Sequence, residues 1–97
     1  GKRLATMKSC YGIIISGRVQ GVGYRNFALI SANKYNIKGY VKNTYDNKVE
    51  VVCCGEECDT DKFIADLKKG PAFSFVTNVD ITKFDSQSDF DSFEIRY

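Results

Sequence analysis

The chain has 97 residues, 43% of them hydrophobic and 27% charged, with a formal net charge of +2. This length and composition predict one ordinary globular domain. The small net charge, carried by Lys and Arg spread along the chain, gives no electrostatic footprint for a nucleic acid. No apolar run approaches the ~20 residues of a membrane span. We therefore expect neither nucleic-acid nor membrane partners.

The first six residues are expected to be a leader outside the fold. Met7 is the only methionine, which favours it as the native start and residues 7–97 as a single domain. No hydrophobic segment follows the basic residues near the beginning, so the pattern of a secretory signal is missing. The predicted location is the cytoplasm.

A short apolar strand, residues 11–15, leads into a glycine-bearing loop and then a helix over residues 26–35. The loop reads GRVQGVGYR over residues 17–25. Gly21 and Gly23 permit positive φ and leave no Cβ between the backbone and a bound oxygen. Arg25 adds a planar guanidinium suited to two phosphate oxygens. A strand, tight turn and helix start direct several backbone N–H groups at one anion.

The rest of the chain predicts four strands and one further helix. The helix has N-cap candidates in residues 58–61 and ends before Gly70, and a turn containing Asp46 joins the first two of these strands. A polar, turn-like stretch is expected over residues 82–91. The four strands lie within residues 37–43, 49–54, 76–84 and 93–97. The order, βαββαβ plus a short final strand, predicts an α+β ferredoxin-like sandwich with two helices on one face of an antiparallel sheet.

Histidine is absent, so histidine-based triads and histidine-ligated zinc sites are excluded. The cysteines near residue 53 lack C-x-x-C spacing, and none stands five residues before an arginine. A hydrolase built on this chain would therefore work without a cysteine or histidine nucleophile, and no metal site is predicted.

Several motifs at matching separations resemble the acylphosphatase family. They are GRVQGVGYR, GYVKN over residues 39–43, VEV over 49–51, KGP over 69–71 and the closing FEIRY. The resemblance implies metal- and cofactor-independent hydrolysis of an acyl phosphate, with inorganic phosphate as product and inhibitor, by a monomer. It also implies that Asn43 positions the attacking water and that Arg25 binds phosphate together with the loop backbone of Val19, Gln20, Gly21, Val22, Gly23 and Tyr24.

The chain departs from the family pattern at a few positions that leave Arg25 and Asn43 untouched. Tyr24 stands where phenylalanine is usual, and Tyr40 where tryptophan is common. Asn36 and Asn47 replace frequent glycines, and Asn tolerates positive φ better than other residues with a side chain. These changes affect local stability more than the expected chemistry.

Two other classes of function are compatible with this order of elements. One is a non-catalytic ferredoxin-like module that binds a small anion or regulates a partner. The other is an RNA-binding sheet, which should carry aromatic residues on a central strand, whereas residues 49–54 carry none. A related segment also occurs at the front of larger carbamoyl-handling proteins.

The expected strand order, 4-1-3-2, places the first and third strands side by side. Cys10 begins the first strand and Cys54 ends the third, so antiparallel pairing brings them within disulfide reach. Cys53 is a poorer partner because adjacent strand residues face opposite sides of the sheet. We expect this pair to be reduced in a reducing cytoplasm and able to oxidise after purification.

Overall fold

The computed structural model describes residues 8–85 and 90–97, and these form one five-stranded sheet with two helices. The proposed leader, residues 1–6, and part of the predicted turn-like stretch lie outside the described residues. The elements are β1 (Lys8–Arg18), α1 (Tyr24–Lys34), β2 (Lys38–Asn43), β3 (Val49–Glu56), α2 (Glu57–Lys69), β4 (Phe75–Phe84) and β5 (Phe93–Arg96).

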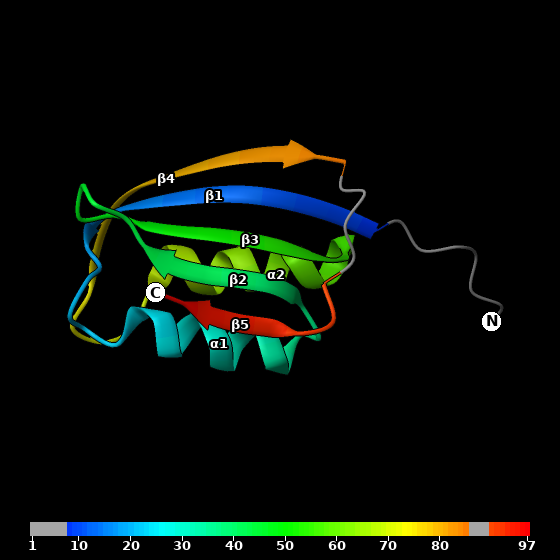
Figure 1. Ribbon diagram of the computed structural model, residues 1–97, viewed down its shortest axis with the longest axis horizontal. Helices are drawn as coiled ribbons and strands as arrows, with labels where there is room; N and C mark the ends of the chain where they lie inside the picture. Colours follow the sequence, from blue (N-terminus) through cyan, green and yellow to red (C-terminus); the bar gives the residue numbers. More distant parts are fainter. Residues whose placement is uncertain (1–7, 86–89) are drawn as a thin grey trace, which may run out of the picture.

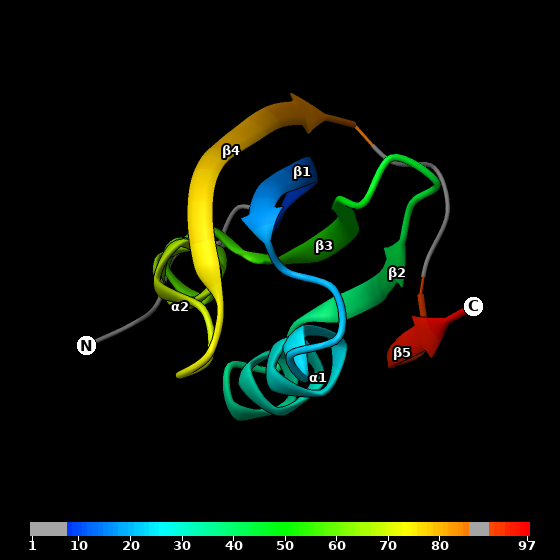
Figure 2. The same ribbon diagram turned by 90° about the vertical axis from the view of Figure 1, so that its left-hand side faces the viewer.

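The strands follow the order β4-β1-β3-β2-β5 (Figure 1). The pairs β1–β4, β1–β3 and β2–β3 are antiparallel, which confirms the predicted ferredoxin-like arrangement. The final strand adds a parallel pair with β2, so the sheet as a whole is mixed. The sheet curves around both helices, which lie on its concave side (Figure 2).

The core lies between the helices and the concave face of the sheet. Alternate residues of β1 and β3 point into it, as the strand period of two requires. The buried face of α2 consists of the four residues expected from helical spacing, Thr60, Phe63, Ile64 and Leu67. Among residues 8–85 and 90–97, the structure has no helix long and apolar enough to cross a membrane.

Several element boundaries differ from the predicted ones; the first strand, expected over residues 11–15, runs from Lys8 to Arg18. The first helix begins at Tyr24 instead of residue 26, because Gly23 in the left-handed region serves as its N-cap. The second helix begins at Glu57, directly after β3, and Glu56 is its N-cap, not a residue of 58–61. The fourth strand ends at Phe84, as predicted, whereas the turn-like stretch expected over residues 82–91 is strand over its first three residues.

Several residues in turns and at a bulge have a positive φ. Asn36, after α1, and Asn47, in the β2–β3 turn, both have positive φ, at 58° and 66°. Asp46 lies in that turn, where it accepts a hydrogen bond from the Thr44 hydroxyl. Gly17 sits at a bulge between β1 and β4, and a Cβ there would lie 2.0 Å from the Phe75 carbonyl oxygen.

Candidate active site

The site forms where the loop after β1 meets the end of β2 and the residues around β5. A cleft of about 310 Å³ opens there. Its lining residues come from parts of the chain far apart in the sequence: Val19, Gly21, Gly23, Tyr24, Arg25, Asn26, Asn43, Ile95 and Tyr97. In Figure 1 this end of the sheet lies on the left, where the loop, the β2–β3 turn and the C-terminus come together.

The loop residues fulfil different structural roles. Gly21 and Gly23 have φ of 74° and 77°, and a Cβ at either position would meet no atom within 4 Å. Their glycine identity is therefore required by backbone conformation, not by crowding. Val19 and Tyr24 are buried, and the Tyr24 hydroxyl donates a 2.5 Å hydrogen bond to the Leu67 carbonyl oxygen. These two side chains anchor the loop to the core.

The first turn of α1 has the electrostatics of an anion site. Gly23 caps the helix without a side-chain hydrogen bond, and the first turn carries no acidic residue. Its backbone N–H groups therefore keep their partial positive charge for an external acceptor. No acidic side chain lies among the described residues that line the cleft.

Arg25 is the second residue of α1 and lies half-buried in the cleft wall. Its guanidinium carbon lies 4.7 Å from the centroid of the Tyr97 ring, which is within the range of a cation–π contact. A guanidinium that stacks on an aromatic ring can still donate hydrogen bonds through its N–H groups.

Asn43 is the last residue of β2, opposite Val49 of β3, and lines the same cleft as Arg25. Its Oδ1 atom is buried and has no hydrogen-bond partner among the described residues. Buried polar atoms are rarely left unpaired, because desolvation without a hydrogen bond costs about 1–3 kcal/mol. Asn43, a residue of the cleft lining, therefore carries a buried acceptor for which the described residues supply no donor.

The structure brings most of the predicted site residues into this cleft. Gln20 and Val22 are exceptions: neither lines it, and the Gln20 side chain is directed toward the β2–β3 turn. Asn26, Ile95 and Tyr97 also line the cleft, and none of them was predicted as a site residue. The alternation of Phe93, Ile95 and Tyr97 predicted the strand but not its neighbour, which is β2, with Val41 opposite Ile95 and Lys42 opposite Arg96.

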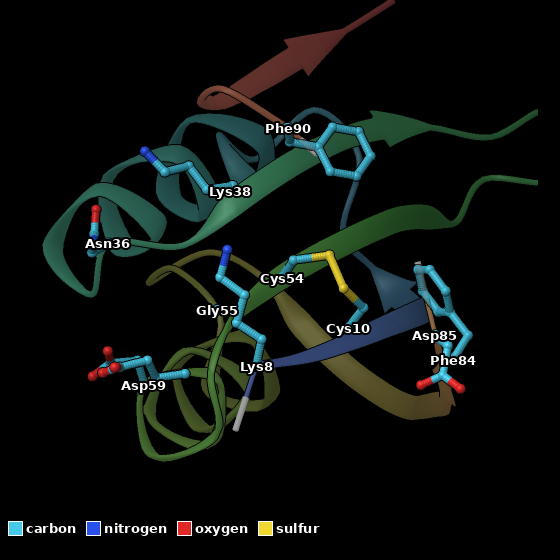
Figure 3. A pocket seen from close by; sticks show the side chains of 11 residues that line it. Lys8, Cys10, Asn36, Lys38, Cys54, Gly55, Asp59, Phe84, Asp85 and Phe90 are labelled. Carbon is cyan, nitrogen blue, oxygen red and sulfur yellow. A yellow bond between two sulfur atoms is a disulfide. The ribbon is translucent and has the colours of Figure 1, made fainter. Parts of the chain in front are cut away.

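A larger cavity of about 550 Å³ lies at the opposite end of the sheet (Figure 3). The Cys10–Cys54 disulfide forms part of its lining, and the two residues are directly opposite in the β1–β3 register. Charges of both signs surround it, including Lys8, Lys38 and Asp59. This cavity lacks the glycine loop, and the helix start beside it, that of α2, carries the acidic residues Glu57 and Asp59 in its first turn. We therefore assign the anion site to the smaller cleft.

Comparison with known proteins agrees with this geometry. The family model described as acylphosphatase matches residues 11–95. The acylphosphatase of Archaeoglobus fulgidus is 42% identical over 85 residues, which cover 88% of this chain and 94% of that protein. The crystal structure of the Bacillus subtilis acylphosphatase is 40% identical, with a TM-score of 0.89, and the match covers 94% of this chain and all of that one.

A third similarity involves a much longer protein. Full-length HypF, solved in a phosphate- and nucleotide-bound form, matches with 28% identity and a TM-score of 0.86. The match covers 99% of this chain and 13% of that one. The higher identities and the nearly complete mutual coverage are with the single-domain acylphosphatases. The chain belongs to the acylphosphatase family.

Proposed function

We propose that the chain hydrolyses acyl phosphates to a carboxylate and inorganic phosphate, without a metal ion or cofactor. In this proposal Arg25 and the loop backbone from Val19 to Tyr24 bind the phosphoryl group, and Asn43 positions the attacking water. The observation that carries it is the meeting of Asn43, Arg25 and the start of α1, which has no side-chain cap, in the lining of one cleft.

The chemistry of an acyl phosphate suits such a site. The carboxylate is a good leaving group, so the reaction needs little general-acid assistance. Charge in the loose transition state spreads over the equatorial phosphoryl oxygens, where backbone N–H groups and a guanidinium stabilise it. A catalytic group then has only to hold water in line with the phosphorus.

A neutral amide suits that last task better than a carboxylate. Asn43 can accept a hydrogen bond from water through Oδ1 without adding negative charge beside a phosphoryl dianion. A phosphoryl oxygen of the substrate takes the water's proton, so no histidine is needed in this scheme. Ile95 and Tyr97 add apolar surface to the lining of the same cleft.

Benzoyl phosphate hydrolysis, measured with and without EDTA, tests the overall reaction. We expect hydrolysis at the same rate in both conditions, and a loss on chelation restored by Mg²⁺ would contradict the mechanism. The variant Asn43→Ala should lower kcat by about 10²–10³-fold, the cost of losing one well-placed catalytic group. Inhibition by inorganic phosphate should change little, since Asn43 is proposed to hold water and not phosphate.

The proposal also includes the setting in which the enzyme acts. We propose a cytoplasmic monomer with a small-molecule substrate and no nucleic-acid or membrane partner. The net charge of +2 supports the absence of a nucleic-acid partner. Sedimentation of the purified chain and fractionation of cells test the oligomeric state and the location.

A further inference from the structure

The side chain of Gln20 leaves the phosphate loop and crosses to the β2–β3 turn. Its Nε2 donates hydrogen bonds to the carbonyl oxygens of Thr44, at 2.9 Å, and Lys48, at 2.8 Å. Both amide hydrogens are thereby used, and both acceptors lie more than 20 residues away along the chain. The half-buried Gln20 side chain joins two segments that the backbone does not connect directly.

The two acceptors belong to residues at opposite ends of the β2–β3 turn, Thr44 and Lys48. Thr44 N–H donates to the Lys48 carbonyl oxygen at 2.9 Å, and the Lys48 N–H donates to the Thr44 hydroxyl at 3.1 Å. The Gln20 amide therefore contacts a closed unit of the β2–β3 turn. Asn43 immediately precedes this unit.

The geometry points to a positioning role for Gln20 in the hydrolysis, and this inference rests on the proposed function. We propose that its amide holds the phosphate loop and Asn43 at the separation needed for in-line attack. The phosphoryl group binds to one of the two segments and water to the other. A misplacement of about 1 Å between reacting groups costs on the order of 10²-fold in rate.

This role predicts a specific kinetic pattern for Gln20→Met, which retains an unbranched side chain and loses both hydrogen bonds. We expect kcat to fall 10- to 100-fold, while the inhibition constant of inorganic phosphate changes less than threefold. The positive-φ glycines and α1 form the phosphate site independently of the amide, so phosphate binding should survive. An unchanged kcat, or a rise in the phosphate inhibition constant that accounts for the whole loss, would overturn the inference.

A double-mutant cycle with Asn43→Ala tests whether Gln20 acts through the water-holding residue. If it does, Gln20→Met should lower kcat less than twofold in the Asn43→Ala background. Two independent, multiplicative losses would overturn the inference. Failure of the wild type to hydrolyse benzoyl phosphate, or a fully active Asn43→Ala variant, would instead contradict the proposed function itself.

A second variant, Gln20→Glu, makes kcat depend on pH if the Gln20 hydrogen bonds position the reacting groups. A general loss of packing would not produce this dependence. The ionised carboxylate cannot donate to the two carbonyl oxygens, whereas the protonated acid can donate to one of them. The kcat of Gln20→Glu relative to wild type, measured at each pH, should therefore rise as the pH is lowered. A ratio independent of pH would argue against the hydrogen bonds as the cause, and this measurement remains informative if Gln20→Met fails to fold.

Ser74→Ala is a matched control for the loss of a side chain–backbone hydrogen bond in a turn. The Ser74 hydroxyl donates to the Pro71 carbonyl oxygen at 2.7 Å, outside the residues that line the cleft. We expect wild-type kcat for this variant. A kcat loss equal to that of Gln20→Met would show a general response to loosened turns and would overturn the specific role.

Discussion

The two ends of the sheet are built in different ways. At the cleft end, three parts of the chain meet, and a buried acceptor, Asn43 Oδ1, lacks a donor among the described residues. At the other end, a disulfide joins the central strands β1 and β3 directly. The larger cavity lies at the disulfide end, and the smaller cleft contains the residues suited to phosphate binding.

Cavity size is therefore a poor guide to chemistry in this fold. A site for a small dianion needs preorganised donors and an unsatisfied acceptor more than it needs volume. The comparison also separates two quantities that experiments can measure independently. Changes at the cleft end should affect turnover, and changes at the disulfide end should affect the free energy of unfolding.

Arg25 offers the strongest test of the cleft end. Arg25→Ala should lower kcat/KM by about 10²–10³-fold, or about 3–4 kcal/mol of transition-state stabilisation, because the phosphoryl group loses a charged bidentate donor. Arg25→Lys keeps the charge without the planar fork and should rescue little. Steady-state kinetics with benzoyl phosphate measure both variants.

Arg96→Ala is the matched control for Arg25. Its guanidinium carbon also lies over a tyrosine ring, 4.1 Å from the centroid of Tyr40, but Arg96 does not line the cleft. We expect its kcat/KM to remain within about twofold of wild type, because surface changes away from a site have small effects.

Near wild-type turnover of Arg25→Lys would remove the bidentate geometry from the mechanism.

Removal of the disulfide should have the opposite signature. The Cys10–Cys54 bond has a sequence separation of 44, and closing a loop of that length restricts the unfolded chain. The chain-entropy model gives a stabilisation of up to about 4 kcal/mol. The double variant Cys10→Ser/Cys54→Ser should therefore unfold at lower urea concentration than the oxidised wild type, with kcat unchanged below its transition.

Cys58→Ser controls for loss of a thiol without loss of a bridge, because Cys58 is free and exposed. Its unfolding curve should overlay that of the wild type. Peptide mapping under non-reducing conditions should recover Cys10 linked to Cys54 after mild oxidation. Recovery of Cys10 linked to Cys58 would contradict the β1–β3 register.

A smaller effect is expected from alkaline pH. Burial raises the pKa of the Cys53 thiol from 9.0 to about 12, and burial also raises the pKa of Tyr24. Between about pH 9 and 12 the unfolded chain therefore binds fewer protons than the folded chain. Stability should be unaffected by Cys53 below pH 9 and then fall by about 1 kcal/mol per pH unit.

Urea unfolding between pH 7 and 11 measures this dependence. Cys53→Ala should remove the decline that begins near pH 9 and leave the later contribution of Tyr24, whose ordinary pKa is 10.0. An identical pH profile for Cys53→Ala and wild type would show that the thiol is not the titrating group.

The sequence predicted the features that depend on local patterns. Residues 11–15 alternate into a buried strand, Gly21 and Gly23 occupy positive φ, and the strand order places Cys10 opposite Cys54. Each of these follows from strand periodicity, glycine's freedom or the topology of a known fold. The acylphosphatase motifs identified Arg25 and Asn43, which lie far apart in the sequence and line one cleft.

The missed features depend on tertiary contacts that no local pattern encodes. Residues 93–97 predicted a strand but not its partner, since β4 and β2 both offer an edge of the four-stranded part of the sheet and β5 pairs in parallel with β2. The placement of Tyr97 against Arg25 follows from that pairing. The early start of α1 at Tyr24 lacked a Ser, Thr, Asp or Asn signal, because a left-handed glycine is its N-cap.

The differing environments of the cysteines have a practical consequence for handling the protein. In the oxidised state Cys10 and Cys54 are joined and Cys53 is buried, which leaves Cys58 as the exposed thiol of the described chain. Cys58 lies in the first turn of α2, just after β3 ends, whereas the cleft lies where β3 begins. A maleimide dye or a thiol-reactive surface should therefore attach at Cys58 and leave the proposed active-site cleft open to solution.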